Sequence, residues 1–329
     1  MYTGADFLID KDMNIYLSEV NTGLPGGAQE YDLIHRLLFN RASGVFLKIE
    51  KICREQYKKP FKKYIRELSF FKDLKTLKIW MDEQGPPPVN PDNYLRLEDK
   101  WVQYLVLSGN YPVIPTVLFN KENLGYFKEA LLQDQCFILK RRFGRGGRGF
   151  RKILNLSGLD NLIESEITSN FYIQQPYLNS TVKCGKDMFR LSLRALSFAG
   201  KFICMYANIS KKVTSNHGFL FYVNPDKHLG IKGCSFNITL VTKRAWEAHI
   251  FFGKDMPDYL YHNLNEEQVS DSVLNIPQDI YEKIIKISTS ISRFYMELDA
   301  SELPKCYLEE EGFNDFPDGQ KITEEMKGE

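Results

Sequence analysis

The chain has 329 residues, enough for one large composite domain or for two or three packed subdomains. Its composition, 43% hydrophobic and 26% charged, is typical of a folded globular protein and excludes a disordered tail protein, a collagen and a minimal disulfide scaffold. The formal net charge of +1 gives no overall field that attracts nucleic acid or an anionic membrane. An anionic ligand must therefore be bound by a local cluster of basic side chains or backbone N–H groups.

Cysteine spacing and the amino-terminal segment predict the cellular compartment of the protein. The six cysteines lie far apart and form no CxxC pair, which disfavours a zinc ribbon and a thioredoxin-type redox site. The first residues carry no basic and apolar leader, and no apolar run approaches the roughly 20 residues that span a bilayer. We expect a cytoplasmic protein with reduced thiols and with neither nucleic acid nor a membrane as a partner.

The first predicted element is a β-hairpin. Residues 4–9 and 14–20 resemble two short strands joined by a polar turn at 10–13. From about 31 to 80 the hydrophobic spacing becomes helical, and the many lysines of this stretch favour a solvated helix face over an anion site. GPPPVNPDN at 85–93 cannot continue a helix and predicts a linker.

Beyond the linker, short helices and strands alternate. The predicted helices are 99–107, 121–132, 158–167 and 278–298, and the predicted extended segments are 111–119, 135–140, 151–154, 171–178, 188–198 and 201–209. The remainder beyond 209 reads as mixed loop and helix and ends in an acidic, frayed tail.

A glycine-rich loop at 144–149 follows an apolar strand that ends in Lys140. The loop matches GxGxxG, but residues 150–154 alternate as a strand, whereas a dinucleotide-binding fingerprint needs a helix there. The context is therefore a flap between two strands, which can close over a triphosphate with its backbone N–H groups while Arg145 and Arg148 add positive charge. An ordinary glycine-rich hairpin turn is the alternative.

The first hairpin carries a cluster of side-chain oxygens. If the turn pivots between Asp12 and Met13, Asp6 lies opposite Glu19, and Asn21 shares the face of Glu19 because side chains alternate along a strand. Two facing carboxylates repel each other unless a cation lies between them, and magnesium prefers a few such oxygens together with nucleotide phosphates. A polar strand face in solvent is the equal alternative, and a shift of one residue in register would remove the cluster.

Together these segments resemble the ATP-grasp superfamily of carboxylate–amine and carboxylate–thiol ligases. GADFLIDKDMNIYLSEVNTGLPGG at 4–27 is similar to the family's closing segment, in which an aspartate and a Glu-x-Asn triplet bind magnesium. The resemblance implies that Asp6, Glu19 and Asn21 are the metal ligands, for two magnesium ions. The loop after Asn21 resembles a substrate-proximal loop, although a plain turn is as good an explanation.

Two further segments resemble the phosphate-binding parts of the family. LEDKWVQYLVLSGNYPVIPTVLF at 97–119 is similar to the segment that opens the ATP-grasp module, which implies that Lys100 reaches the nucleotide phosphates. FILKRRFGRGGRGF at 137–150 resembles the central lysine and flap, which implies that Lys140 contacts the α-phosphate and the adenine edge. The flap residues implied to bind ATP are Arg145, Gly146, Gly147, Arg148 and Gly149.

The adenine hinge and the catalytic arginines are also assigned by resemblance. QQPYL resembles the hinge, which implies that Gln175 lies near the exocyclic amine, that the Pro176 carbonyl accepts from that amine, and that the Leu178 N–H donates to the ring. KDMFRLSLRALSFAGK at 186–201 resembles a strand pair whose arginines, here Arg190 and Arg194, meet the γ-phosphate or the acyl phosphate.

The order of the segments departs from the usual family. The metal-binding hairpin comes first, so the chain resembles a circularly permuted ATP-grasp protein, similar in order to eukaryotic-type glutathione synthetase and the glutathionylspermidine synthetase group. The implied fold is α+β, with two α+β subdomains that grip ATP and an added helical section. The expected parts are the hairpin and substrate loop at 1–40, a helical insert and linker at 41–96, the nucleotide-binding region at 97–212, and the rest of the core with a helical section and acidic tail at 213–329.

The activity implied by the resemblance is an ADP-forming ligase that acts through an acyl phosphate. Its partners would be a small-molecule or peptide carboxylate and an amine or thiol acceptor, which the sequence does not identify, and a homodimer or a separate partner chain is left open. Two alternatives remain at this point. One is a nucleotide-binding scaffold without turnover, and the other is a kinase on the same fold.

Overall fold

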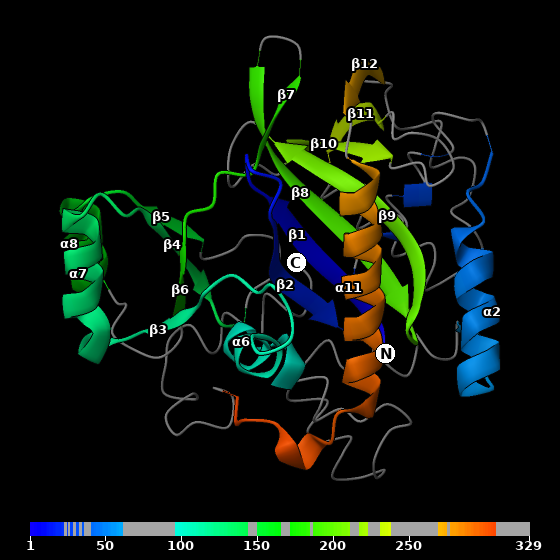
Figure 1. Cartoon of the computed structure of the whole chain (residues 1–329), viewed down its shortest axis with the longest axis horizontal. Coiled ribbons are helices and arrows are strands. Elements are labelled where there is room, and N and C mark those ends of the chain that lie inside the picture. Colours follow the sequence, from blue (N-terminus) through cyan, green and yellow to red (C-terminus); the bar gives the residue numbers. More distant parts are fainter. Residues whose placement is uncertain are drawn as a thin grey trace. The chain divides into compact units, whose positions relative to one another are not determined.

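The computed structural model has a mixed α+β architecture, which agrees with the expected α+β class (Figure 1). It describes residues 1–22, 25, 27, 28, 31, 32, 35, 41–61, 96–143, 150–165, 172–184, 187–210, 217–222, 231–237, 269–274 and 277–306. These fall into two compact units, one within 1–69 and 179–298 and the other within 70–178 and 299–329. Among the described residues, no helix is both long enough and apolar enough to cross a membrane.

The first unit is built on an eight-stranded antiparallel sheet in the order β12-β11-β10-β9-β8-β1-β2, in which β7 also pairs with β8. Its strands are β1 (Tyr2–Ile9), β2 (Ile15–Thr22), β7 (Thr181–Cys184), β8 (Asp187–Phe198), β9 (Lys201–Ser210), β10 (His217–Tyr222), β11 (Ile231–Asn237) and β12 (Val269–Leu274). Because β8 pairs with β1, the first residues of the chain are joined to a strand almost two hundred residues later.

The predicted hairpin is confirmed, including the register at Asp6 and Glu19. Asp6 lies opposite Glu19 in the β1–β2 ladder. An irregularity directly after Asp6 shifts the pairs nearer the turn by one residue, but it leaves this pair in place. At the turn, Asp10 accepts hydrogen bonds from the backbone N–H groups of Asp12 and Asn14, each at 2.9 Å. The hairpin therefore holds Asp6 and Glu19 face to face.

Helix α11 (Gln278–Glu297) covers one face of this sheet over β1, β8 and β9 (Figure 1). Its buried face includes Ile284 and Ile291, as helical periodicity predicts. Buried serines allow close approach: Ser288 Oγ lies 2.7 Å from Ser197 Oγ on β8, and Ser292 donates to the Met1 carbonyl at 2.9 Å. Helix α11 thus fixes β1 and β8 side by side.

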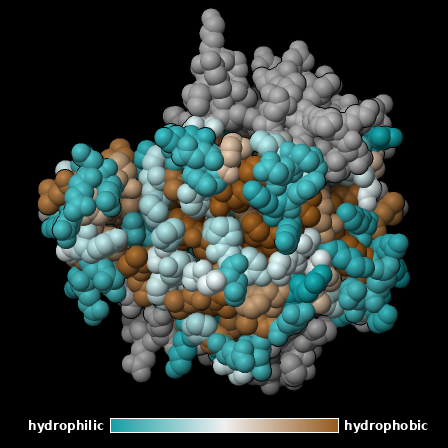
Figure 2. All heavy atoms as spheres, in the orientation of Figure 1, coloured by the Kyte–Doolittle hydropathy of each residue, from teal (hydrophilic) through white to brown (hydrophobic). Residues whose placement is uncertain are grey.

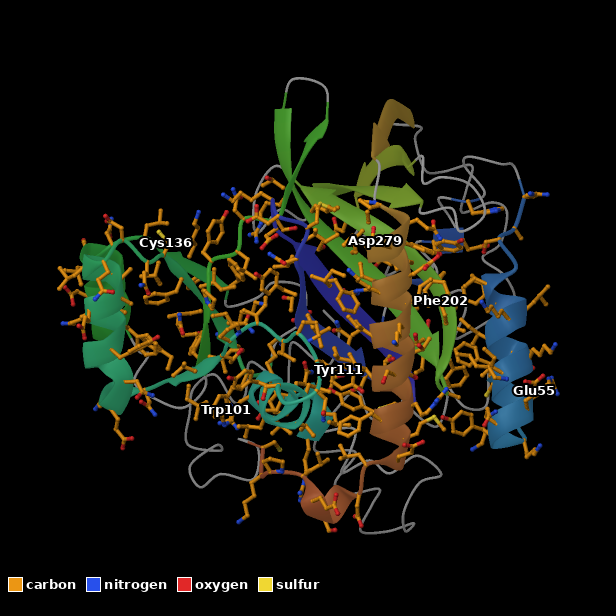
Figure 3. The ribbon with its side chains drawn as sticks, in the orientation of Figure 1. Glu55, Trp101, Tyr111, Cys136, Phe202 and Asp279 are labelled. Carbon is orange, nitrogen blue, oxygen red and sulfur yellow. The ribbon has the colours of Figure 1, made fainter. Side chains whose placement is uncertain are left out.

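Helix α2 (Val45–Tyr57) lies within the long helical stretch predicted after the first hairpin. It is attached to β9, because Glu55 pairs with Lys201 at 2.9 Å and Lys48 donates to the Ile203 carbonyl at 3.3 Å. Phe202 of β9 lies between α2 and α11 (Figure 3). The outward side of α2 is mainly hydrophilic (Figure 2), and Lys51 of the predicted lysine face is exposed, whereas Lys48 contacts β9 and the lysines of that face from residue 62 onward lie outside the described residues.

The second unit contains a four-stranded antiparallel sheet in the order β3-β6-β4-β5. Its elements are α6 (Lys100–Leu107), β3 (Val117–Phe119), the 3-10 turn η2 (Lys121–Asn123), α7 (Leu124–Leu132), β4 (Phe137–Arg141), β5 (Arg151–Ile153), α8 (Leu156–Ser165), β6 (Tyr172–Pro176) and the 3-10 turn η3 (Ala300–Glu302). Helices α7 and α8 cover one face of the sheet through a core that includes Phe127, Phe137 and Leu139. Lys140 and Gln175 belong to the other face by alternation.

The sequence interpretation was wrong for part of the region beyond residue 209. We expected mixed loop and helix there, but β10, β11 and β12 extend the first sheet at 217–222, 231–237 and 269–274. These strands are short, and their pairing partners are β9 and one another. Local periodicity is weak in such short segments, so long-range pairing rather than residue pattern defines them.

Ser180 is a buried link between three segments of the first unit. Its hydroxyl donates to the Leu191 carbonyl at 2.7 Å and accepts from the Ile9 N–H at 3.1 Å. We predict that Ser180→Ala lowers the free energy of unfolding by about 1–3 kcal/mol, because both backbone groups lose their partner inside the protein. Urea denaturation measures the change, and Ser108→Ala on the exposed end of α6 is the control, expected within about 0.5 kcal/mol of wild type. An equal effect of the two changes contradicts this role for Ser180.

Candidate functional site

Three oxygen-bearing side chains meet on the face of the first sheet opposite α11. Asp6, Glu19 and Asn21 lie together because the β1–β2 register places Asp6 opposite Glu19 and Asn21 two residues further along β2. The Asn21 amide nitrogen donates to Asp6 Oδ2 and to Glu19 Oε1, each at 3.3 Å. The predicted carboxylate and amide cluster on the first hairpin is therefore present, with its three side chains within hydrogen-bonding distance of one another.

Arg194 completes this cluster from the neighbouring strand. It lies opposite Asp6 in the β1–β8 ladder, and its Nε and Nη2 donate to Asp6 Oδ1 and Oδ2, each at 2.6 Å. The side chains are partly buried, with 25% of Arg194 and 14% of Asp6 exposed. Such a bidentate pair fixes the guanidinium plane more strictly than a single hydrogen bond does. The sequence predicted a phosphate-facing role for Arg194, but its contact with Asp6 was not foreseen.

The two carboxylates and the guanidinium influence one another's protonation. Burial raises the pKa of the Asp6 carboxyl above its usual value and Glu19 raises it further, while Arg194 opposes the shift. Burial also disfavours the charged guanidinium, but Asp6, Tyr206 and Glu19 together outweigh this and raise the pKa of Arg194 well above its ordinary value.

The glycine-containing loop after β2 packs over the same face. A Cβ on Gly4 would lie 2.7 Å from Pro25 Cβ, so glycine is needed there for the loop to approach β1. Gly27 has a φ of +137°, and a Cβ at this position would lie 2.8 Å from Tyr206 Cε1. Tyr206 in turn lies opposite Arg194 in the β8–β9 ladder. The described part of the predicted substrate-proximal loop is thus adjacent to the Asp6 cluster.

The donor set of this cluster fits a magnesium ion in kind. Two carboxylates and one amide are the ligand types that magnesium takes alongside nucleotide phosphates. The Asn21 amide nitrogen now faces both carboxylates, and a half-turn of the amide would bring its carbonyl oxygen to the same place. No group of three or more His, Cys, Asp or Glu side chains suited to a metal gathers among the described residues. An ion here would therefore depend on Asn21 and on ligand oxygens as well.

In the second unit, Lys140 and Gln175 share the sheet face opposite α7 and α8. Lys140 lies opposite Ile173 in the β4–β6 ladder, and Gln175, two residues along β6, lies opposite Ile138. Pro176 ends β6, and Leu178 follows two residues later. The structure thus brings the predicted central lysine and hinge together on adjacent strands.

The side-chain carbonyl oxygen of Gln175 is a buried acceptor. Its Nε2 donates to Thr116 Oγ1 at 3.0 Å, and that hydroxyl donates onward to the Ile114 carbonyl at 2.8 Å. The hydroxyl proton is used in the second bond, so Thr116 can only accept from Gln175, and this fixes the orientation of the amide. The Gln175 Oε1 atom is buried and accepts no hydrogen bond from any residue that the structure describes. A donor that reached this oxygen would relieve a cost of about 1–3 kcal/mol.

Lys100 is the first residue of α6, and the neighbouring Asp99 caps this helix. Asp99 Oδ1 accepts from the Trp101 N–H at 2.9 Å. The Lys100 N–H donates to the Arg142 carbonyl at 3.1 Å, and the Arg142 guanidinium pairs with the Asp99 carboxylate. The start of α6 is thereby joined to the chain just after β4, two residues from Lys140. Sequence reasoning missed Arg142, which follows Lys140 and Arg141 in the segment that resembles the central lysine and flap.

Some predicted residues are placed only in part or not at all. Arg190 lies on the same face of β8 as Arg194 but four residues away, about 13 Å along the strand. The five flap residues Arg145, Gly146, Gly147, Arg148 and Gly149 lie outside the described residues.

Comparison with protein-family models and with curated proteins gives no match to this chain.

Proposed function

We propose that the protein is an ATP-dependent carboxylate–amine or carboxylate–thiol ligase of the ATP-grasp type, circularly permuted, that forms ADP and phosphate. The observation that carries the proposal is the meeting of Asp6, Glu19, Asn21 and Arg194 on one sheet face, with Asp6 and Glu19 in the register that the metal-binding interpretation requires. Lys140 and Gln175 on one face of the other sheet support it further.

The residues have distinct roles in this proposal. Asp6, Glu19 and Asn21 would hold magnesium, which neutralises phosphate charge and orients the terminal phosphoryl group. Lys100 and Lys140 would bind the phosphates. The second sheet would hold adenine at the end of β6, with the Gln175 Oε1 atom as an acceptor for its exocyclic amine.

The chemistry proceeds in two displacements. A substrate carboxylate oxygen attacks the γ-phosphorus, the bond to the β-phosphate oxygen breaks, and ADP and an acyl phosphate result. An amine or thiol then attacks the acyl carbon and expels phosphate, which leaves an amide or thioester. Arg190 and Arg194 are positively charged groups on one strand that would stabilise the phosphoryl oxygens as negative charge builds up on them.

The ion pair between Asp6 and Arg194 favours one competing function. A guanidinium already satisfies Asp6, so the protein could bind a nucleotide without a metal and without turnover. Calorimetric titration with the ATP analogue AMP-PNP separates the two functions. The ligase proposal predicts binding that needs magnesium, whereas equal binding with and without magnesium, and no ADP release from ATP, favours the nucleotide-binding module.

Trapping with hydroxylamine tests the acyl phosphate. The protein is incubated with Mg-ATP, hydroxylamine and a panel of amino acids and short peptides as carboxylate donors. A ligase gives a hydroxamate together with ADP, because hydroxylamine attacks the acyl carbon. A phosphorylated hydroxyl product with no hydroxamate would instead identify a kinase and contradict the ligase proposal.

Gln175 is expected to select the nucleobase. We predict that ATP binds at least about 10-fold more tightly than ITP, because inosine carries a carbonyl oxygen where adenine carries an amine, and two acceptors would face each other. Gln175→Leu should bring the two affinities within about threefold. Gln174→Leu, on the opposite face of the same strand, is the control and should keep the preference. Calorimetry with both nucleotides measures the ratio, and an unchanged preference in Gln175→Leu contradicts the assignment.

A further inference from the structure

Asp99 and Arg142, called the anchor pair below, form a buried ion pair in the second unit. Their side chains are 0% and 1% exposed. Arg142 Nε donates to Asp99 Oδ1 at 3.1 Å and to Oδ2 at 3.0 Å, and Nη2 donates to Oδ2 at 2.7 Å. The relative orientation of the two side chains is thus fixed by several directional contacts.

The anchor pair lies between the two segments that carry the proposed phosphate-binding lysines. Asp99 precedes Lys100 and caps α6, while Arg142 follows β4, which carries Lys140. The Lys100 N–H also donates to the Arg142 carbonyl, so backbone and side chains join the same two segments. A displacement of Arg142 relative to Asp99 would therefore change the spacing of Lys100 and Lys140.

Stability alone does not explain a buried ion pair at this place. Removing two charges from water costs about as much as their attraction returns, and apolar side chains of similar volume often serve a fold as well or better. A guanidinium and a carboxylate differ from apolar groups in that their hydrogen bonds fix direction as well as distance. That property matters where two groups must reach successive phosphates.

We propose that the anchor pair positions Lys100 relative to Lys140 so that both lysines reach the phosphate chain of one nucleotide. Asp99 and Arg142 are positioning residues in this proposal and do not touch the ligand. The inference rests on the proposed function, since it assigns a nucleotide to these lysines. It predicts that the anchor pair affects binding of the phosphate chain and leaves binding of the base unchanged.

The test compares AMP, ADP and AMP-PNP in the full chain, with magnesium present. The double variant Asp99→Asn/Arg142→Met removes both charges together and keeps a good helix cap, because asparagine caps as well as aspartate. We expect its affinity for AMP to stay within about twofold of wild type and its affinity for AMP-PNP to fall at least 10-fold. Lys100→Met should weaken AMP-PNP binding in wild type but add little in the double variant, where Lys100 is already displaced.

The matched control removes an exposed ion pair of the same unit. Lys128 and Asp160 pair at 3.2 Å with about half of each side chain exposed, so Lys128→Met/Asp160→Asn should bind all three nucleotides as wild type does. If the Asp99→Asn/Arg142→Met protein does not fold, Asp99→Glu keeps both charges and shifts the carboxylate by one methylene, and the same pattern is expected.

Several results would overturn the inference. Wild-type affinity for AMP-PNP in the anchor variants shows that the pair only supports the fold, and an equal loss for AMP and AMP-PNP shows that the base site itself was damaged. A wild-type protein that binds none of the three nucleotides would overturn the proposed function as well, which distinguishes the two failures.

Discussion

Replacing Glu19 with alanine is expected to abolish ADP formation while the protein stays folded. Glu19 lies opposite Asp6 and shares Asn21 Nδ2 with it, so its loss leaves one carboxylate that is already paired with Arg194. Metal stabilisation of a transferring phosphoryl group contributes several kcal/mol, so the rate should fall more than about 100-fold. The fold should survive because the change also removes repulsion between two facing carboxylates.

A coupled assay for ADP measures the rate, and circular dichroism with thermal unfolding confirms the fold. Asp12→Ala is the control, because Asp12 is an exposed carboxylate at the turn of the same hairpin. It should form ADP at the wild-type rate. An active Glu19→Ala protein would show that the cluster does not hold a metal needed for the reaction.

Arg142→Ala is expected to destabilise the second unit strongly. The change leaves the Asp99 carboxylate buried without its ion partner, and breaking a buried pair in this way typically costs about 3–5 kcal/mol. The same deletion at an exposed pair costs much less, so Lys128→Ala should stay within about 1 kcal/mol of wild type. Urea denaturation followed by circular dichroism gives both values.

The double variant Asp99→Asn/Arg142→Met should recover most of this loss, since no unpaired charge remains inside. Recovery of stability without recovery of AMP-PNP affinity would separate the structural contribution of the anchor pair from its positioning role. An Arg142→Ala protein as stable as wild type would contradict the burial and pairing on which both arguments depend.

The sequence predicted local elements well where a regular pattern was present. Alternation and a polar turn were enough to define the first hairpin and to place Asp6 opposite Glu19. The irregularity after Asp6 was not predictable, because a single extra residue in a strand leaves no periodic signal. It happens to fall on the turn side of the pair, so the predicted cluster survived it.

Contacts between distant segments could not be predicted in the same way. Arg194 reaches Asp6 only because β8 pairs with β1, and no local pattern reports such a pairing. Arg142 follows Lys140 and Arg141 in a basic run that suggests solvent or phosphate, yet it is fully buried against Asp99. Asp99 was not singled out in the segment 97–119, and its cap and ion pair appear only in three dimensions.

The ion pair of Asp6 with Arg194 makes the metal assignment testable at one pair of side chains. If magnesium binds here, the Asp6 carboxylate either accepts a second cation or releases the guanidinium. In the second case Arg194 becomes available to the phosphoryl group. Both outcomes change contacts that are now 2.6 Å long.

A crystal structure with AMP-PNP and magnesium tests the central claim most directly. The proposed function predicts magnesium about 2.1 Å from oxygens of Asp6 and Glu19, and an adenine whose exocyclic amine lies at Gln175 Oε1. A nucleotide bound away from the first hairpin, with Arg194 still bidentate on Asp6 and no metal at Glu19, would contradict it.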